Sequence, residues 1–584
     1  MTSKEFEDDR SFVEANIQLL HDFSNSIKSL NFLAESTLNL LVKMIQLREE
    51  CQVRVYNLWF YIAALKANDI TRSEVKAMDS KVSDLLSRLA QSVKPLDHFL
   101  MTTDEAIMKR LLSISDLKPY AFLWNKNREQ KEHLLSNDEE ALLEALSVNG
   151  HTAWMNLYYD IVGSMKCTLV TDEKEMTVSL SEASAIVYGS SEADRKSAWH
   201  SIQAAWKAQQ ESAAGILNAL AGWRIEVSKK RSKIKTMDFL TQALFDNRIE
   251  ENTLNALIEC CRTNLKRLRQ APRAMAKVAG KGKLDPWDLT ASYPKLANGT
   301  SKSVGDYREG FRLVRDAFDA ISSDMAQFAN LANQNAWIDA RILATKSVGG
   351  FCMEFSKSRE PRIFMTYRGS MNDISTLAHE LGHGYHYWKM RDIHRVEAQY
   401  PSTLAETASV FAEQALRDYL SQRLQTEDRL EAGWTEMEMI LAYLIDIPSR
   451  FEFEKKFHER RIEQTLTAGE LCELIDEART NWYGDTVSAN DNLFWASKLH
   501  FASSGSGFYN FPYAFGYLFA MNLYARRKEH GPTFNQTYVD ILRDTGRLTA
   551  EELVQKHLNE VGHGAFSALI RASIESGLIH TDNL

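Results

Sequence analysis

The feature that most constrains the fold is the run His379-Glu380-Leu381-Gly382-His383, an H-E-x-x-H pattern. Its chemistry requires an α-helix, because residues four apart lie on one face of a helix, where both imidazoles can reach a single metal ion. Glu380 is then directed at a water molecule bound to that ion. The pattern therefore predicts a rigid helix that carries a zinc hydrolase site. The alternative is a pair of solvated histidines on an amphipathic helix.

The residues around this motif predict a strand, a turn and a helix in that order. Residues 362–367 (R-I-F-M-T-Y) are largely β-branched or aromatic, Gly369 interrupts them, and Asn372 or Asp373 is expected to cap the helix. A second strand is expected at 349–355, and it can pair with 363–367 as a hairpin across the polar residues 356–361. An open edge of that hairpin could hold an extended peptide as an added strand.

Two histidines are too few for a stable zinc site, which normally has three protein ligands and leaves one position for water or substrate. The H-x-x-G-x-x-H extension of the metzincins is absent, because His386 replaces its Gly and Lys389 replaces its third His. The alternative is a Glu on a later helix. Glu406 lies 23 residues after His383, which leaves room for one helix to end, a turn near 401–402, and a second helix to cross beside the first.

Glu413 lies seven residues after Glu406 and therefore on the same helical face. One interpretation is a carboxylate that accepts a hydrogen bond from a metal-binding imidazole. The other interpretation is a simple surface carboxylate.

Two blocks of sequence carry a family resemblance. Residues 376–386 (T-L-A-H-E-L-G-H-G-Y-H) and 403–413 (L-A-E-T-A-S-V-F-A-E after Thr403) resemble the oligoendopeptidase F branch of the thimet oligopeptidase family of zinc peptidases. Residues 500–517 (H-F-A-S-S-G-S-G-F-Y-N-F-P-Y-A-F-G-Y) are similar to the His, Gly-rich loop and Tyr cluster of that family. The resemblance covers roughly residues 200 to 580 and reaches the N-terminal part by length and helical character only.

The resemblance implies a set of roles. His379, His383 and Glu406 would bind one zinc ion per chain, and Glu380 would be the general base. The residues that would bind substrate and stabilise the transition state are His500, Tyr509 and Tyr513. The family usually has a Tyr where this chain has Phe511, which leaves open how the roles divide among Tyr509, Tyr513 and Tyr517. The resemblance also implies a deep channel between two helical lobes, which would restrict substrates to short peptides.

Physical chemistry supports a role for the second block. Peptide hydrolysis builds negative charge on the carbonyl oxygen, and phenols and a histidine are suitable hydrogen-bond donors to it. Gly505 and Gly507, interleaved with serines, predict a loop that can move and approach the substrate backbone. Pro512 suits the first turn of a helix, which places Tyr509 on the loop and Tyr513 on the helix. The alternative is a flexible linker followed by an aromatic core helix.

Composition favours a mostly α-helical protein. Only 10 Pro and 26 Gly interrupt 584 residues, too few for an all-β fold with its many turns. A seam of apolar residues at helical spacing runs through Val75, Met78, Val82, Leu85 and Leu89. We expect two helical lobes around the H-E-x-x-H helix, with a small β-hairpin or sheet beside the active site. The interruption at 189–194 suggests an N-terminal helical domain (1–195) and a zinc peptidase domain (196–584).

Charge and cysteine usage narrow the setting. The formal net charge of -9 and the pI near 6.0 argue against nonspecific binding to nucleic acid or to an anionic membrane. The N-terminal residues are polar and acidic and lack an apolar signal core, and six cysteines without a C-x-x-C pair are expected to be reduced thiols. These features predict a cytoplasmic protein. They give no indication of its oligomeric state.

The sequence thus predicts a zinc-dependent endopeptidase that hydrolyses internal bonds of short peptides. A related zinc carboxypeptidase that acts on free C-termini is one alternative. A noncatalytic helical scaffold with a relic metal site is the other.

Overall fold

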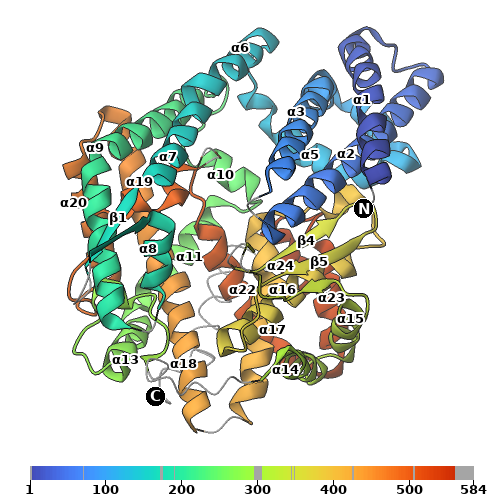
Figure 1. Cartoon of the computed structure of the whole chain (residues 1–584). Coiled ribbons are helices and arrows are strands. Elements are labelled where there is room, and N and C mark those ends of the chain that lie inside the picture. The colour runs from blue at the N-terminus through green and yellow to red at the C-terminus, as the bar shows by residue number, and fades with distance from the viewer. Residues whose placement is uncertain are drawn as a thin grey trace.

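The computed structural model describes residues 3–69, 72–170, 175–189, 191–294, 305–343, 345–346, 349–423, 426–503, 505 and 507–558. Most of these residues are helical, which confirms the predicted fold class. The N-terminal helices lie together above a small sheet, and a second stack of helices that includes α7, α8, α9 and α20 stands on the opposite side (Figure 1). Within the described residues, none of the helices combines the length and the apolar character needed to cross a membrane.

The N-terminal helices have two small cores of their own, one of which contains the seam predicted at 75–89. Val75, Val82 and Leu85 on α3 are at most 2% exposed and pack against α1 and α2. The helices of this part are α1 (Ser3–Ser26), α2 (Glu35–Asn68), α3 (Ser73–Thr102), α4 (Glu105–Ser113) and α5 (Ala121–Arg128). Helix α6 (Asn137–Ser147) follows them, and α7 (Ala153–Ser164) belongs to the second stack.

The second stack is built around the long helix α9. The apolar face of α9 packs against segments that precede it and segments that follow it in the sequence. Tyr158, Leu217 and Phe453 belong to this one core. The elements are β1 (Lys166–Val170), β2 (Glu175–Ser179), α8 (Leu180–Val187), α9 (Glu192–Arg231), α19 (Ile447–Glu463), α20 (Ala468–Tyr483) and α21 (Phe494–Ser497). Because α9 begins at Glu192 and its core includes residues on both sides of 195, packing does not separate 1–195 from 196–584. That division stays a prediction.

The largest core lies under the metal motif and joins the remaining helices. They are α10 (Thr241–Asp246), α11 (Glu251–Thr263), α12 (Leu265–Leu268), α13 (Gln270–Val278), α14 (Tyr307–Asp319), α15 (Ser323–Gln334), α16 (Met371–Lys389), α17 (Ser402–Ser421), α18 (Thr426–Ile440), α22 (Phe511–His530), α23 (Phe534–Asp544) and α24 (Ala550–Leu558). Of these, α16 carries the H-E-x-x-H residues, α17 packs against α16, and α22 packs against the α17 helix.

The predicted hairpin is present, with shifted ends. Strand β4 (Phe351–Phe355) pairs antiparallel with β5 (Glu360–Phe364), and the short β3 (Ile338–Asp339) pairs parallel with β5 on its other side. The order β3-β5-β4 makes β4 an edge strand of this sheet. The second strand was expected at 363–367, but pairing with β4 ends at Phe364, after which the Met365 and Tyr367 N–H groups bond the carbonyls of Asp339 and Ala340.

Candidate active site

Helix α16 begins two or three residues earlier than its expected cap implied. Ser370 caps it: its hydroxyl accepts a hydrogen bond from the N–H of Asp373, and the Asp373 carboxylate accepts one from the N–H of Ser370. The expectation of Asn372 or Asp373 as the cap is therefore wrong, because Asp373 completes a reciprocal capping pair from inside the helix. One face of α16 is fully buried, through Ile374, Leu377, Ala378 and Leu381. This burial makes the helix rigid.

Glycine brings the two metal-site helices together. A Cβ atom at Gly382 would lie 2.5 Å from the carbonyl oxygen of Ala408 and 2.6 Å from the Cα of Ser409 on α17. Only a residue without a side chain allows this approach. The glycine of H-E-x-G-H is thus required for packing, because it allows α17 to lie against α16 and brings Glu406 to the histidines.

The three ligand atoms predicted from sequence lie together. The Nε2 atoms of His379 and His383 are 3.1 Å apart, and the Glu406 Oε2 atom is 3.5 Å from the first and 3.4 Å from the second. These separations allow all three atoms to contact one ion, and two imidazole nitrogens with one carboxylate oxygen is a donor set that suits catalytic zinc. Burial raises the pKa of Glu406, but the hydrogen bond and charge of His383 and the charge of His379 lower it to about 2.

Glu413 fixes the orientation of one ligand imidazole. Its Oε1 atom lies 2.6 Å from Nδ1 of His379, and the Ser375 hydroxyl donates to its Oε2 atom at 3.3 Å. The predicted contact between Glu413 and an imidazole of the motif is therefore present, and its role beside a bound metal stays a prediction. A proton on Nδ1 leaves the Nε2 lone pair of His379 directed at Glu406 and His383. Burial lowers the pKa of His379, but the hydrogen bond to Glu413 outweighs burial and raises this pKa to about 9. A metal ion at Nε2 therefore competes with a proton there.

Glu380 lies beside this site and beside the start of β4. Its side chain is buried, and its Oε2 atom has no hydrogen-bond partner among the described residues. Burial raises its pKa, which is the property expected of a general base that must both take and release a proton near neutral pH. A Cβ atom at Gly350 would lie 3.1 Å from the Glu380 Oε1 atom, so the glycine leaves the approach to this carboxyl open.

The second block lies against α17, the helix that carries Glu406. A Cβ atom at Gly516 on α22 would lie 2.8 Å from the Cβ of Glu406, so α22 passes directly over the third ligand. Pro512 lies in the first turn of α22, as predicted. The rings of His500 and Tyr509 are 4.7 Å apart, and the Tyr513 hydroxyl lies 3.4 Å from that of Tyr509.

The three tyrosines differ in exposure. Tyr509 is 48% exposed and Tyr513 is partly buried, whereas Tyr517 is only 2% exposed and stacks on Tyr443 at 5.1 Å. The structure therefore groups His500, Tyr509 and Tyr513 at the surface of the site and places Tyr517 in the core behind it.

Sequence reasoning missed the residues that hold His500. The Asn510 Oδ1 atom lies 2.5 Å from Nδ1 of His500 and accepts a hydrogen bond from Arg450 at 3.0 Å. Because a guanidinium only donates, Arg450 fixes the oxygen of Asn510 in this position, and Nδ1 of His500 must carry the proton. Asn510 directly follows Tyr509 and could have been considered, but Arg450 is 60 residues away on α19 and gave no local signal.

This arrangement changes the expected role of His500. Burial lowers its pKa to about 4, partly offset by the hydrogen bond to Asn510, so the ring is neutral near pH 7. With the proton on Nδ1, Nε2 of a neutral ring is an acceptor. His500 was expected to donate to a developing oxyanion, which would require the imidazolium. Its geometry suits acceptance of a hydrogen bond from a substrate N–H.

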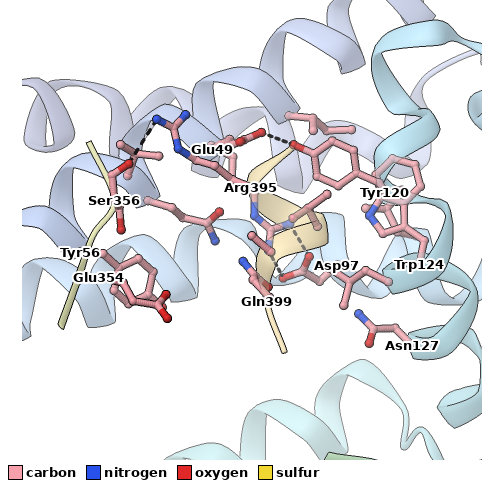
Figure 2. A pocket seen from close by; sticks show the side chains of 18 of the residues that line it. Glu49, Tyr56, Asp97, Tyr120, Trp124, Asn127, Glu354, Ser356, Arg395 and Gln399 are labelled. Atoms are coloured by element: carbon pink, nitrogen blue, oxygen red, sulfur yellow. Dashed lines mark hydrogen bonds and ion pairs between the residues drawn. The ribbon is translucent and has the colours of Figure 1, made fainter. Parts of the chain in front are cut away.

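Of the cavities that lie between the N-terminal helices and the rest of the molecule, two are lined in part by α3. One of about 1260 Å³ is lined by α3 and α6 on one side and by α9 on the other. The second, of about 230 Å³, lies between α2, α3 and α5 on one side and the end of β4 on the other (Figure 2). In its wall the Tyr120 hydroxyl donates to Glu49 and Arg48 pairs with Asp97 (Figure 2).

A further group of acidic residues carries its own cation. Glu192, Asp285 and Asp288 approach one another closely enough to hold an ion. The Lys281 ammonium lies 2.5 Å from Glu192, 2.9 Å from Asp285 and 2.5 Å from Asp288. A lysine therefore occupies the position that a metal ion would take.

Comparison with known proteins agrees with this geometry. The oligoendopeptidase F homolog of Lactococcus lactis is 24% identical over 569 residues, which is 95% of this chain and 91% of that protein. Oligopeptidase PepF of Bacillus subtilis is 22% identical over 513 residues, 86% of this chain and 75% of that protein. The crystal structure of oligoendopeptidase F from Enterococcus faecium superposes with a TM-score of 0.71 at 15% identity and covers 100% of this chain and 99% of that one.

Pz peptidase A, solved with an inhibitor, superposes with a TM-score of 0.73 at 16% identity and covers 98% of this chain and 97% of that one. A family model described as oligopeptidase F matches residues 100–166. The model of peptidase family M3 matches residues 186–561, which include every residue of the candidate site. The chain belongs to peptidase family M3, as a metallopeptidase similar to oligoendopeptidase F.

Proposed function

We propose that this protein is a zinc-dependent endopeptidase that cleaves internal bonds of short peptides. The observation that carries the proposal is the meeting of three ligand atoms within 3.5 Å of one another, beside a buried Glu380 whose Oε2 atom has no hydrogen-bond partner in the described part of the chain. His379, His383 and Glu406 would hold one zinc ion. When bound there, zinc lowers the pKa of a water ligand and polarises the scissile carbonyl.

The residues of the chain divide the remaining work. Glu380 accepts a proton from the attacking water and later delivers it to the leaving amine. Tyr509 and Tyr513 donate hydrogen bonds to the negative charge that develops on the carbonyl oxygen. His500 holds the substrate backbone through Nε2. Glu413 keeps His379 in the tautomer that leaves Nε2 available.

The surroundings support short peptides as substrates. Strand β4 is a sheet edge that begins next to Glu380, so an extended peptide can add to it through main-chain hydrogen bonds that do not depend on side-chain identity. The cavity between α2, α3, α5 and the end of β4 lies between packed elements, where an unfolded peptide fits better than a folded protein. We therefore infer broad side-chain preferences.

Six free cysteines without a disulfide suit a reducing compartment, and on this ground we propose that the enzyme works in the cytoplasm.

One experiment tests the function against its alternatives. The purified protein is analysed for metal and incubated with peptides whose C-termini are either free or amidated. An endopeptidase cuts internal bonds of both kinds, and a chelator abolishes the cleavage, which added zinc restores. Cleavage restricted to free C-termini would identify a carboxypeptidase instead. Bound metal without cleavage of any peptide would favour the noncatalytic scaffold.

A further inference from the structure

Two charged side chains from other helices anchor the segment that links His500 to Tyr509. Arg224 of α9 donates from its guanidinium to the carbonyl oxygens of Ser503 and of Gly505, the latter at 3.2 Å. Glu454 of α19 accepts a hydrogen bond from the N–H of Phe508 at 2.8 Å. We call Ser503, Gly505, Gly507 and Phe508 the anchored segment.

The backbone of the anchored segment is shaped to fit between these two side chains. A Cβ atom at Gly507 would lie 3.2 Å from an Arg224 nitrogen and 3.4 Å from the Glu454 Oε1 atom. Gly507 has a φ of 82° and Phe508 a φ of 52°, a conformation that a phenylalanine adopts only when its surroundings impose it. Phe508 is 1% exposed, and its ring lies 5.7 Å from that of Phe451 and 5.1 Å from that of His458.

The charges explain why the segment is held firmly. A buried charged group is stable only when hydrogen-bond partners replace its lost water. Arg224 finds carbonyl oxygens and Glu454 finds a backbone N–H, and both partners come from the anchored segment. Burial lowers the pKa of Arg224 and raises that of Glu454 to about 7, while each charge favours the charged form of the other. Both side chains therefore lose their partners if the segment moves away.

We propose that Arg224 and Glu454 are positioning residues, which set the distance between His500 at one end of the anchored segment and Tyr509 at the other. The rings of His500 and Tyr509 are 4.7 Å apart across this connection, so any displacement of the segment changes how the two side chains face the substrate. This inference rests on the proposed function, because it gives the two anchors a purpose in peptide cleavage. It differs from the expectation of a glycine loop that can move, which stays a prediction.

Arg224→Met tests the first anchor, and Arg231→Met is its matched control. Arg231 lies on the same helix and is paired with Glu140 at 2.6 Å, away from the anchored segment. We expect Arg224→Met to lower kcat by about 100-fold, the cost of misplacing a reacting group by about 1 Å, with unchanged zinc content. Arg231→Met should keep the wild-type rate. A kcat of Arg224→Met within about threefold of the control would overturn the proposal.

Glu454 offers a test by conservative replacement. Glu454→Gln keeps an oxygen that can accept from the Phe508 N–H, whereas Glu454→Leu keeps only the volume. Positioning predicts a much larger loss of kcat in the Leu variant than in the Gln variant. The control is Glu452→Gln on the same helix, whose carboxylate binds Arg262 and Trp482 instead. Equal losses in both Glu454 variants would contradict an acceptor role.

Gly507→Ala perturbs the same contact from the side of the segment. If the contact acts as one unit, Gly507→Ala and Arg224→Met are non-additive, and the double variant is little worse than either single variant. Independent, multiplying losses would count against the proposal.

Hydrogen exchange gives a readout that does not depend on activity. The amides of Gly505, Gly507 and Phe508 should exchange faster in Arg224→Met than in Arg231→Met, while the amides of α16 stay unchanged. Equal exchange in the two variants sinks the proposal even if the protein is an active peptidase. Faster exchange without any peptidase activity in the wild-type protein would sink the proposed function and leave the anchors in place.

Discussion

The helices that carry the proposed zinc ligands, and the block that we propose to face substrate, are built in different ways. In α16 and α17, the residues that meet come from two short motifs, and their contact is set by Gly382 against Ala408. The block around His500 is held by residues from distant helices: Arg450 through Asn510, and Arg224 and Glu454 through the anchored segment. The proposed zinc ligands are therefore encoded in two short motifs, whereas the proposed substrate-facing surface is assembled from distant parts of the sequence.

The largest expected effect on either region is the loss of kcat when Glu380 is replaced. Glu380→Gln keeps the size of the side chain but cannot accept a proton from water, so we expect kcat to fall by about 10² to 10⁴-fold. Zinc content should stay at the wild-type level, because Glu380 is not one of the three grouped ligands. Steady-state kinetics and metal analysis of the purified variant check both expectations. Near wild-type turnover would remove Glu380 from the mechanism.

The two glutamates of α17 separate a ligand from a supporting group. Glu406→Ala removes one of three proposed ligand atoms and should abolish zinc retention during dialysis. Glu413→Ala removes only the partner of His379 Nδ1, and we expect it to weaken zinc affinity or activity by about 10 to 100-fold. Metal titration against a competing chelator measures the difference. Equal zinc affinity in Glu406→Ala and the wild type would refute the assignment.

The tyrosines test the substrate-facing block. Tyr509→Phe or Tyr513→Phe removes one hydroxyl with little change of shape, and we expect kcat to fall by about 100-fold while KM changes little. Tyr517→Phe serves as the internal control, since this ring is 2% exposed and stacks on Tyr443 in the core. Its effect should be milder. If both Tyr509→Phe and Tyr513→Phe kept kcat within about threefold, the block would be a core helix after a linker.

The same contrast explains which features could be predicted from the sequence. The fold class, the hairpin and the grouping of His379, His383 and Glu406 could be predicted, because helical spacing and the composition of short segments determine them. The position of Glu413 followed from the same spacing. The cap of α16 was misplaced, since Ser370 and Asp373 satisfy each other reciprocally.

What could not be predicted depends on contacts between distant segments. Arg450 and Asn510 meet only after α19 and α22 have packed, and no periodicity in either helix indicates that contact. The same holds for Arg224 beside the glycines of the anchored segment, which local sequence describes as flexible. The core shared by Tyr158 and Phe453 likewise could not be read from the interruption at 189–194.

The smallest expected effect concerns the protonation of His500. It decides whether Nε2 of His500 accepts a hydrogen bond from a substrate N–H. In the folded chain burial lowers the His500 pKa to about 4, below the usual value of about 6.5. The stability that comes from keeping the ring neutral is therefore full above pH 6.5 and is lost as the pH falls toward 4.

Asn510→Asp places a carboxylate against Nδ1 and raises the pKa of His500, so the ring becomes an imidazolium at a higher pH. If Nε2 must accept a hydrogen bond from the substrate, the acidic limb of kcat/KM moves to higher pH in Asn510→Asp, with about a tenfold loss near pH 6. Asn510→Leu is the control, because it breaks the same hydrogen bond without adding charge and should lower kcat/KM without that shift. A limb at the same pH in both variants would mean that His500 does not act through a neutral Nε2, and the donor role would then be the better account of its position.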